Sequence, residues 1–313
     1  MAIKYRRKKG FMKVGLINLE PKIHNTALMK ISQYHKQKGD EVELFIDLFQ
    51  NLYDKIYCAS LFDFTNKELI PVNAICGGTG FDIKTKLPKD IENCDLDYSL
   101  FPNCKTSYVW FSRGCIRNCP FCIVRKKEGY IHSVNPTNLN PNGNLIEIMD
   151  NNFFANPEWK NSEKYLDQWQ QPINFNSGID VRIFESEQAS FINKYKIKKV
   201  HTAWDNPKDN LLPKFKELIK YIKPYKITCY VLIGYWSTPE EDYERVMKLR
   251  ELGINPFVMP FDKKNNYQKK FARWVNMKAI FKSVKWENYG SRINILKQKG
   301  EQYEVKRILR VLR

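Results

Sequence analysis

The sequence has no long hydrophobic run, and none of its apolar stretches approaches the ~18 residues that a membrane-spanning helix needs. The basic start, residues 1–9, is followed by no apolar core and cleavage site of the kind that a secretion signal has. Acidic residues are few, since 34 Asp and Glu stand against 52 Lys and Arg in 313 residues. We therefore expect a cytoplasmic protein with a basic surface and no membrane partner.

The charge balance is the most unusual feature of the composition. A net charge of +18 raises the local concentration of polyanions, so nucleic acid is a possible partner. A solvated basic surface without such a partner is the alternative. Hydrophobic residues at 43% and aromatic residues at 14% exclude a disordered chain, because that much apolar surface supports a packed core.

Disulfides are not expected, because the chain is large and shows no secretion signal. Three of its eight cysteines fall within eight residues, which indicates metal or redox chemistry. A zinc ribbon needs a second close pair downstream, and only Cys229 follows, alone on a predicted strand. The other four cysteines are interpreted as small buried or incidental residues: Cys58, Cys76, Cys94 and Cys104.

The first part of the chain predicts a short Rossmann-like domain over residues 12–95, after a basic extension over 1–11. Apolar strand patterns alternate there with a helical pattern, which is typical of a parallel sheet. A glycine-rich turn, Gly77-Gly78-Thr79-Gly80, follows the last of these strands. The strands are expected at 12–19, 41–46 and 55–61, and the helix at 25–38.

The second part predicts a TIM-like partial (β/α)6 barrel over residues 105–262, so the fold class is α/β. An irregular charged segment, 84–107, is expected to carry the crossing between the domains. A basic helical tail follows over 263–313, and its aromatic residues are expected to cover the open side of the barrel. Strands are expected at 107–112, 145–149, 173–175, 198–202, 227–233 and 256–261, and helices at 185–195, 208–222 and 239–251.

The most informative segment is Ser112-Arg113-Gly114-Cys115-Ile116-Arg117-Asn118-Cys119-Pro120-Phe121-Cys122. Three thiolates spaced by three and then two residues can each bind a different iron of one cubane cluster. The fourth iron then has no protein ligand and is open to another molecule. The alternative is three cysteines that pack or bind zinc.

This C-x3-C-x2-C loop resembles the radical S-adenosylmethionine superfamily, since Phe121 precedes the last cysteine and a β/α pattern follows. The resemblance covers about residues 12–262 and implies a [4Fe-4S] cluster on Cys115, Cys119 and Cys122, with Phe121 beside the cofactor. It implies that S-adenosylmethionine binds the open iron and is cleaved reductively to a 5′-deoxyadenosyl radical. Such chemistry needs an electron donor, such as flavodoxin or ferredoxin, as a partner.

The Rossmann-like segment before a Ser-Arg-Gly-Cys loop is similar to the subgroup in which a cobalamin-binding-type domain precedes the radical barrel. The Asp-x-His-x-x-Gly signature of those domains is absent, because His24 lacks the Asp two residues before and the Gly three after. Cobalamin is therefore doubtful as a cofactor. Methylthiotransferases are a related family, but they need three N-terminal cysteines for a second cluster, and only Cys58 and Cys76 stand at comparable strand ends.

The resemblance also implies which residues hold S-adenosylmethionine. Asp150, with Asn151, follows the second barrel strand, where the family holds the methionine amino group; the alternative is a plain turn. After the third strand, Asp180 suits ribose hydroxyls and Arg182 suits the cofactor carboxylate, or the two form an internal salt bridge. Two further implied contacts are Ser177, at the same barrel mouth, and Gly234, which allows close approach to adenine.

Trp204 and Asp205 follow the fourth barrel strand and emerge at its carboxyl end, where such folds place active sites. We therefore predict that both line the substrate chamber as catalytic residues. His201 is interpreted as a structural residue rather than a base. Thr238 and Pro239 predict the start of a helix, with an N-cap followed by a proline.

The substrate is the least specific of these predictions. The positive charge favours a nucleic acid or nucleotide, and the basic and aromatic residues of 263–313 fit phosphate binding and base stacking as well as helix packing. A radical enzyme acting on a small metabolite or a peptide is one alternative. A non-catalytic iron-sulfur protein that binds nucleic acid is the other, and it would keep the cluster without cleaving S-adenosylmethionine.

Overall fold

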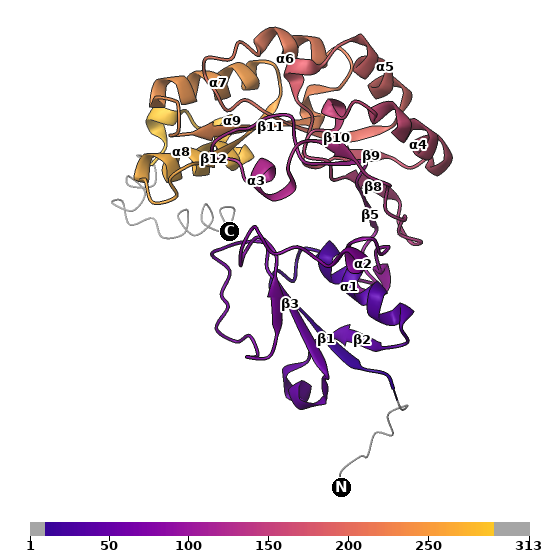
Figure 1. Cartoon of the computed structure of the whole chain (residues 1–313). Helices are drawn as coiled ribbons and strands as arrows, with labels where there is room; N and C mark the ends of the chain where they lie inside the picture. The colour runs from indigo at the N-terminus through magenta and orange to yellow at the C-terminus, as the bar shows by residue number, and fades with distance from the viewer. Residues whose placement is uncertain (1–9, 291–313) are drawn as a thin grey trace. The chain divides into compact units, whose positions relative to one another are not determined.

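The structure, a computed structural model, describes residues 10–290 (Figure 1). The basic residues before 10 and the tail after 290 lie outside the described residues. The chain divides into two compact units, the first ending at Asn174 and the second beginning at Phe175. This division falls in a strand of the predicted barrel, whereas the sequence places a boundary between residues 95 and 105. The predicted domain bounds stay a prediction.

A four-stranded parallel sheet forms the amino-terminal part of the first unit. Its strand order is β2-β1-β3-β4, with β1 paired to β2 and β3, and β3 paired to β4. The order turns back after β1, as it does in doubly wound α/β folds. The strands are β1 (Lys13–Asn18), β2 (Glu41–Leu44), β3 (Lys55–Ala59) and β4 (Ile75–Gly77).

Helix α1 (Thr26–Gln37) packs on this sheet and has clear local start and stop signals. The Asn25 side chain accepts hydrogen bonds from the backbone N–H groups of Ala27 and Leu28, so it caps the first turn. Gly39 follows the helix with φ +88°, a conformation that favours glycine at a helix end. Both signals lie at the ends of the helix that the sequence predicts.

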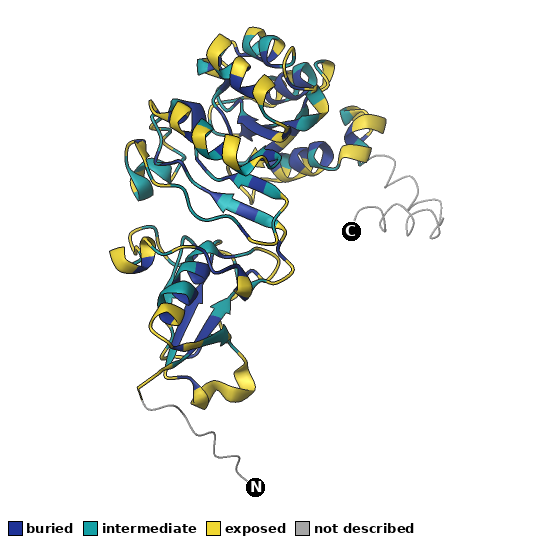
Figure 2. Ribbon diagram, turned by 90° about the vertical axis from the view of Figure 1, so that its right-hand side faces the viewer, coloured by how far each residue is buried: buried dark blue, intermediate teal, exposed yellow. Residues whose placement is uncertain are grey.

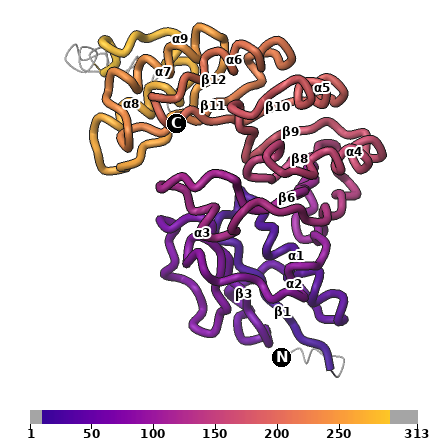
Figure 3. Tube along the Cα trace, turned by 45° about the horizontal axis from the view of Figure 1, so that its top comes forward, coloured from indigo at the N-terminus to yellow at the C-terminus, as the bar shows by residue number. Residues whose placement is uncertain are grey.

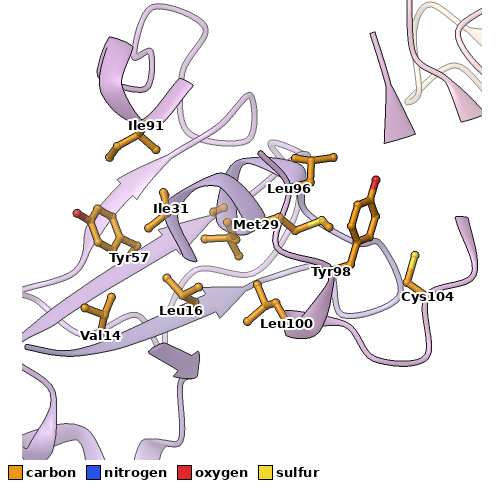
Figure 4. Packing of buried hydrophobic residues seen from close by; sticks show 12 residues of the cluster. Val14, Leu16, Met29, Ile31, Tyr57, Ile91, Leu96, Tyr98, Leu100 and Cys104 are labelled. Carbon is orange, nitrogen blue, oxygen red and sulfur yellow. The ribbon is translucent and has the colours of Figure 1, made fainter. Parts of the chain in front are cut away.

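The core of this part lies between α1 and the sheet. Val14 and Leu16 of β1 and Met29 of α1 are at most 1% exposed. Figure 4 shows these side chains together with residues of the segment between β4 and β5. Burying one such side chain contributes about 1.5–3 kcal/mol, so this cluster stabilises the segment as well as the sheet. The segment contributes Ile91, Leu96, Tyr98, Leu100 and Cys104.

A six-stranded sheet has the order β12-β11-β10-β9-β8-β5. The pairs β5–β8, β10–β11 and β11–β12 are parallel. Strands β5 and β8 belong to the first unit and β10 to β12 to the second, while β9 contains the division. The strands are β5 (Thr106–Val109), β8 (Leu145–Ile148), β9 (Ile173–Phe175), β10 (Ile197–Ala203), β11 (Ile227–Ile233) and β12 (Asn255–Pro260).

Helices alternate with the strands of the second unit, which is how parallel strands are connected. Helix α7 contacts β11 and β12, and α8 contacts β12. Figure 2 shows exposed residues on the outer sides of the helices and buried residues on the strands, and Figure 3 shows β11 and β12 side by side. The helices are α5 (Ser186–Lys194), α6 (Leu212–Leu218), α7 (Pro239–Glu251), α8 (Asn266–Asn276) and α9 (Lys278–Ser283).

The predicted start of α7 is confirmed in detail. The Thr238 hydroxyl accepts from the Glu241 N–H (3.3 Å), and the Glu241 carboxylate accepts from the Thr238 N–H (2.8 Å). This reciprocal pair is a capping box, and Pro239 occupies the first helical position, where its missing N–H is not needed. The interpretation of Thr238 and Pro239 as structural residues therefore holds.

The described part of the predicted tail is helical. Phe271 and Trp274 of α8 and Phe281 of α9 are at most 5% exposed, and Trp274 lies 5.3 Å from Trp286 between ring centroids. These aromatic residues pack among themselves, as the packing interpretation expects. Whether they cover an open side of a barrel stays a prediction, as does the function of the lysines.

The remaining elements of both units are short. In the first unit they are η1 (Asp47–Leu52), α2 (Lys89–Glu92), η2 (Tyr98–Leu100), β6 (Ser112–Arg113), α3 (Val124–Glu128), β7 (His132–Ser133), η3 (Phe153–Ala155), η4 (Trp159–Ser162) and α4 (Glu163–Trp169). In the second they are η5 (Val181–Ile183), η6 (Pro224–Lys226) and η7 (Trp286–Asn288). The α/β class with parallel sheets is confirmed. None of the described helices has both the length and the apolar character for crossing a membrane.

Candidate functional site

The three clustered cysteines lie on one loop of the first unit, between β6 and α3. Cys115, Cys119 and Cys122 are all partly exposed, and none is in a disulfide. Within the loop, the Cys122 N–H donates to the Cys119 carbonyl (3.0 Å), and the Arg117 N–H donates to the Cys115 sulfur (3.4 Å). The loop thus presents three thiols from a short stretch of irregular backbone.

The base of this loop is closed by several contacts. Strands β6 and β7 form an antiparallel pair with Arg113 opposite His132. The Cys115 N–H donates to the Gly129 carbonyl (3.4 Å), and the Arg125 guanidinium donates to the Cys115 carbonyl (3.1 Å). Both flanks of the first cysteine are therefore tied to the segment that follows the loop.

Glu128 joins the two flanks through its carboxylate. One oxygen accepts from the Gly114 N–H (3.0 Å) and from the Asn151 side-chain amide (2.8 Å). The other lies 3.2 Å from the Arg113 guanidinium. Asn151, predicted to touch the cofactor, is thus placed beside the cysteine loop, where its amide holds Glu128.

Asp150 also lies at the base of the loop, but its carboxylate is buried and bonded. Only 1% of the residue is exposed, and its oxygens accept from the Phe111 N–H (2.8 Å) and the Ser112 hydroxyl (2.5 Å). Burial is the main cause that raises the pKa of Asp150 to about 7. The geometry makes Asp150 a residue that positions the strand before the loop, and its predicted contact with a methionine amino group is not part of this arrangement.

The loop carries three cysteines that could bind a cluster, but their side chains are not arranged around a common metal position. In the range 10–290, no group of three or more Cys, His, Asp or Glu side chains is arranged to hold a metal ion. The donor set still fits an iron-sulfur cluster, because three partly exposed thiols, none of them in a disulfide, share eight residues of one loop. Cluster binding requires these thiols to turn toward one point, while the contacts at the base hold the flanks.

In the second unit, Asp180 and Arg182 contact each other. The Arg182 guanidinium donates to Asp180 (2.7 Å) and to Asp209 (3.2 Å), and the Arg182 N–H also donates to Asp180. The internal salt bridge, which was the alternative interpretation, is therefore the observed arrangement. The Asp180 side chain is 5% exposed and the Arg182 side chain 36%. Ligand binding by either residue would compete with this pair.

Trp204 is a core residue rather than a residue open to a substrate. It is 3% exposed, its indole N–H donates to the Asp209 carbonyl (3.0 Å), and its ring lies 5.7 Å from that of Phe215. The prediction that Trp204 faces the substrate therefore differs from the structure, in which the side chain packs in the core. The large apolar indole is buried there, although Trp204 comes directly after a strand end.

Asp205 follows Trp204 and is bonded inside the unit. Its carboxylate accepts from the Leu232 N–H (3.2 Å), which joins the end of β10 to β11. Burial raises the pKa of the carboxyl group above its ordinary value. Its predicted catalytic role stays a prediction, since the observed contact is structural.

Arg245 of α7 organises the carboxyl ends of β10 and β11. Its guanidinium donates to the carbonyls of Trp204 (2.7 Å), Asp205 (2.9 Å) and Leu232 (3.1 Å). It also donates to the Asp242 carboxylate (2.7 Å), and both side chains are at most 3% exposed. This buried ion pair therefore fixes the strand ends on which the predicted residues lie.

Gly234 adopts φ +77°, in agreement with a glycine that allows close approach. The approaching group is Gln268 of α8, whose amide nitrogen would lie 2.0 Å from a Cβ at this position. The predicted place beside adenine is thus taken by a protein side chain. His201, interpreted as structural, is 5% exposed, bonds the Phe175 carbonyl (2.9 Å) and stacks on Tyr230, so that interpretation fits.

Phe121 and Ser177 are further predicted residues that are accessible. Phe121 lies within the cysteine loop and is partly exposed, and Ser177 follows β9 and is exposed. Gly178, next to Ser177, has φ +114° and approaches the His201 carbonyl closely, so the turn after β9 is fixed to β10. Ser177 therefore lies on a constrained turn of the second unit.

The residues connected with cobalamin or a second cluster have structural partners. His24 bonds the Tyr108 hydroxyl (2.9 Å), and burial lowers the pKa of its ring. Cys58 and Cys76 are register partners on β3 and β4, and burial raises the pKa of Cys58 to about 12. Such a thiol is neutral at physiological pH, which suits the buried role expected for Cys58.

Glu128 and Arg245 were not predicted from the sequence. No local pattern identifies Glu128, because its partners come from both sides of the cysteine loop. Arg245 does have a signal: Asp242, Arg245, Val246 and Leu249 are spaced as one helix face, and all four are buried. A charged pair on an apolar helix face indicates a buried network.

No family model matches this chain, and no curated protein matches it.

Proposed function

We propose that the protein is a radical S-adenosylmethionine enzyme whose [4Fe-4S] cluster is bound by Cys115, Cys119 and Cys122. The observation that supports this most is the loop itself, with three partly exposed cysteine thiols on a stretch whose base is closed by Glu128, Gly129 and Arg125. A structural zinc site needs four protein ligands, one more than the three cysteines of this loop. Three ligands suit a cluster with one open iron.

The rest of the proposal assigns tasks to residues of this chain. The six-stranded sheet, with its alternating helices, serves as the partial (β/α)6 barrel. Asp150 and Glu128 both position the backbone that leads into the first cysteine, so that the loop starts from a fixed point. A [4Fe-4S] cluster held by the three cysteines would supply one electron for reductive cleavage of S-adenosylmethionine to methionine and a 5′-deoxyadenosyl radical, which would take a hydrogen atom from the substrate. Phe121 and Ser177 are the accessible candidates for cofactor contact.

The substrate we propose is a nucleic acid or nucleotide. The net charge of +18 supports a polyanionic substrate, since net positive charge attracts phosphate groups. A small metabolite or a peptide is the competing substrate class.

The proposal is tested by anaerobic reconstitution with iron and sulfide, reduction with dithionite, and measurement of 5′-deoxyadenosine. We expect the wild type to form the nucleoside from S-adenosylmethionine and Cys122→Ala to form none. Cys76→Ala is the matched control, because Cys76 is also a partly exposed thiol but lies on β4, outside the loop. Deoxyadenosine formation at wild-type level by Cys122→Ala would refute the ligand assignment.

The non-catalytic alternative has one specific observation in its favour. Arg182, which the radical enzyme would use for the cofactor carboxylate, is already paired with Asp180 and Asp209. A reconstituted protein with a full cluster that forms no deoxyadenosine, with or without nucleic acid, would favour an iron-sulfur protein that only binds nucleic acid.

A further inference from the structure

A pocket of about 780 Å³ lies within the first unit, beside the chain that enters the cysteine loop. Arg113, two residues before Cys115, lines it together with Trp110 and Phe111, which follow β5. Other walls come from residues 133–137, which begin at the last residue of β7, and from η4 and α4. The volume falls within the range of about 300–1,000 Å³ that is typical of small-molecule sites.

The walls of the pocket are held by hydrogen bonds, so the site is preformed. The Val134 N–H donates to the Phe111 carbonyl (2.9 Å). The Asn156 side chain, in a residue only 2% exposed, accepts from the Ser133 hydroxyl (3.0 Å) and the Glu158 N–H (3.2 Å). The stretch after β7 is thereby joined to the segment that leads into η4.

One wall carries a buried polar group that lacks a partner. Ser162 is 1% exposed, and its hydroxyl has no hydrogen-bond partner within the described part of the chain. An unpaired buried hydroxyl is unfavourable, so native proteins rarely keep one without a reason such as a ligand. Because Ser162 lines the pocket, a bound polar molecule is the natural partner for it.

The side chains around the pocket combine flat rings, amides and cations. The Arg113 guanidinium lies 5.3 Å from the Trp110 ring centroid, and the Lys164 ammonium lies 4.8 Å from that of Tyr165. Rings suit the faces of nucleobases, and cations beside them suit phosphate. Amides, which offer a donor and an acceptor and so match base edges, are presented by Asn135, Asn156 and Asn161.

We propose that this pocket binds one nucleotide of the substrate, with the base against Tyr165 or Trp110, the Ser162 hydroxyl paired to a polar atom of the ligand, and phosphate near Lys164. The inference rests on the proposed function for its role as a substrate site, although nucleotide binding itself does not require a cluster. Free nucleotides and single strands present the same chemistry, and the experiment separates them.

The balance of charge in the pocket favours a single nucleotide over a strong phosphate site. Lys30 pairs with Glu92 (2.8 Å) and Arg113 with Glu128 (3.2 Å), so part of the positive charge is already neutralised. Base recognition by stacking and hydrogen bonds must then provide most of the affinity. A simple anion such as inorganic phosphate is therefore expected to bind much more weakly than a nucleotide.

The test is calorimetric titration of the full chain with AMP, GMP, CMP, UMP, inorganic phosphate and six-nucleotide RNA and DNA strands. Tyr165→Ala is expected to weaken binding of the preferred ligand about five- to a hundredfold, while Tyr165→Phe keeps the affinity, since stacking needs only the ring. Lys164→Ala is expected to weaken binding more than Lys160→Ala, which removes the same charge from the neighbouring η4 outside the pocket.

Ser162→Ala gives the sharpest readout. It removes a hydroxyl that has no partner in the free protein, so folding stability is expected to stay equal or rise while nucleotide affinity falls. Wild-type affinity in both Ser162→Ala and Tyr165→Ala, or tighter binding of phosphate than of any nucleotide, would overturn the proposal. If an oligonucleotide binds more tightly than every mononucleotide, the pocket binds one nucleotide within an RNA or DNA strand rather than a free nucleotide.

The two proposals fail separately. Cys122→Ala is expected to bind the nucleotide with wild-type affinity, because Cys122 does not line the pocket. Nucleotide binding in a protein that forms no cluster would refute the proposed function and leave this inference intact. Deoxyadenosine formation in a protein that binds none of the nucleotides or strands would refute the nucleotide pocket and leave the proposed function intact.

Discussion

Gly114 and Gly129 flank the cysteine loop, and both have a positive φ, +81° and +82°. A Cβ at Gly114 would lie 2.5 Å from the Tyr130 carbonyl oxygen, whereas nothing lies within 4 Å of a Cβ at Gly129. Both Gly→Ala changes introduce strain, because a positive φ is unfavourable for an L side chain, but only the first adds a collision with backbone. We therefore expect Gly114→Ala to lose the cluster and Gly129→Ala to keep most of it.

Iron content per chain after reconstitution checks this pair, with circular dichroism as the control for folding. Both variants place an alanine at a positive φ, so a larger loss of iron in Gly114→Ala than in Gly129→Ala is attributed to the close approach at Gly114. Equal iron contents in the two variants would show that the closed base of the loop is not needed for the cluster.

Asp150 makes stability depend on pH in a predictable direction. Burial raises its pKa to about 7 from an ordinary value of 3.8, so the folded chain holds a proton that the unfolded chain releases between these values. Its contribution to stability is therefore present at low pH and is lost as pH rises through about 7. Asp150→Asn removes this loss while keeping an acceptor for the Phe111 N–H.

The difference in the free energy of unfolding, Asp150→Asn minus wild type, is expected to increase by about a few kcal/mol from pH 4 to pH 8. Urea unfolding of both proteins under anaerobic conditions at several pH values measures the difference. A difference that stays constant with pH would mean that Asp150 is ionised throughout this range in the folded protein.

At the scale of elements, α7 is joined to β10 and β11 by the buried Arg245–Asp242 pair. Replacing Arg245 with Met leaves the Asp242 carboxylate buried without its cation and frees strand-end carbonyls of Trp204 and Leu232. Breaking one side of a buried pair typically costs about 3–5 kcal/mol. Arg245→Met is thus expected to destabilise the protein severely, as measured by denaturant unfolding.

Lys248→Met is the matched control for this change on the same helix. Lys248 pairs with Glu244 at the surface, with side chains 38% and 61% exposed, and such pairs contribute about 0.3–0.5 kcal/mol. Similar losses in the two variants would contradict the account of a buried network at the strand ends.

The elements themselves were largely predictable because their signals are local. Strands β9 and β11 and helix α7 have the bounds that the sequence predicts, since apolar runs and caps mark their ends. Strand β4, the β6–β7 pair and α3 were missed. Each has at most five residues, which is too short for a periodic pattern to emerge.

The candidate site was predictable from the sequence only where its functional residues lie close together along the chain. The cysteine spacing identifies the loop, but not Glu128, whose partners Gly114 and Asn151 are 14 and 23 residues away. From the sequence, the partner of Arg182 could be either a cofactor or Asp180. In the structure Arg182 pairs with Asp180 and also with Asp209, a second carboxylate. Long-range packing decides such choices, and no local pattern reports it.

For the whole molecule, the net charge of +18 predicts salt-sensitive binding of nucleic acid. The affinity for a single strand is expected to fall linearly with salt on logarithmic axes, with a slope of about −0.7 per neutralised phosphate. Fluorescence anisotropy with a labelled RNA strand at several salt concentrations measures the slope. If the RNA strand does not bind even at low salt, the basic surface is only solvated and nucleic acid is not its partner.

The central claim is that three cysteines of one loop hold a [4Fe-4S] cluster with one open iron. Electron paramagnetic resonance of the reduced, reconstituted protein, before and after adding S-adenosylmethionine, tests it most directly. The account predicts four irons per chain and a spectrum that shifts when S-adenosylmethionine is added, because the open iron gains a ligand. Zinc in place of iron, or a cluster spectrum that S-adenosylmethionine leaves unchanged, would contradict it.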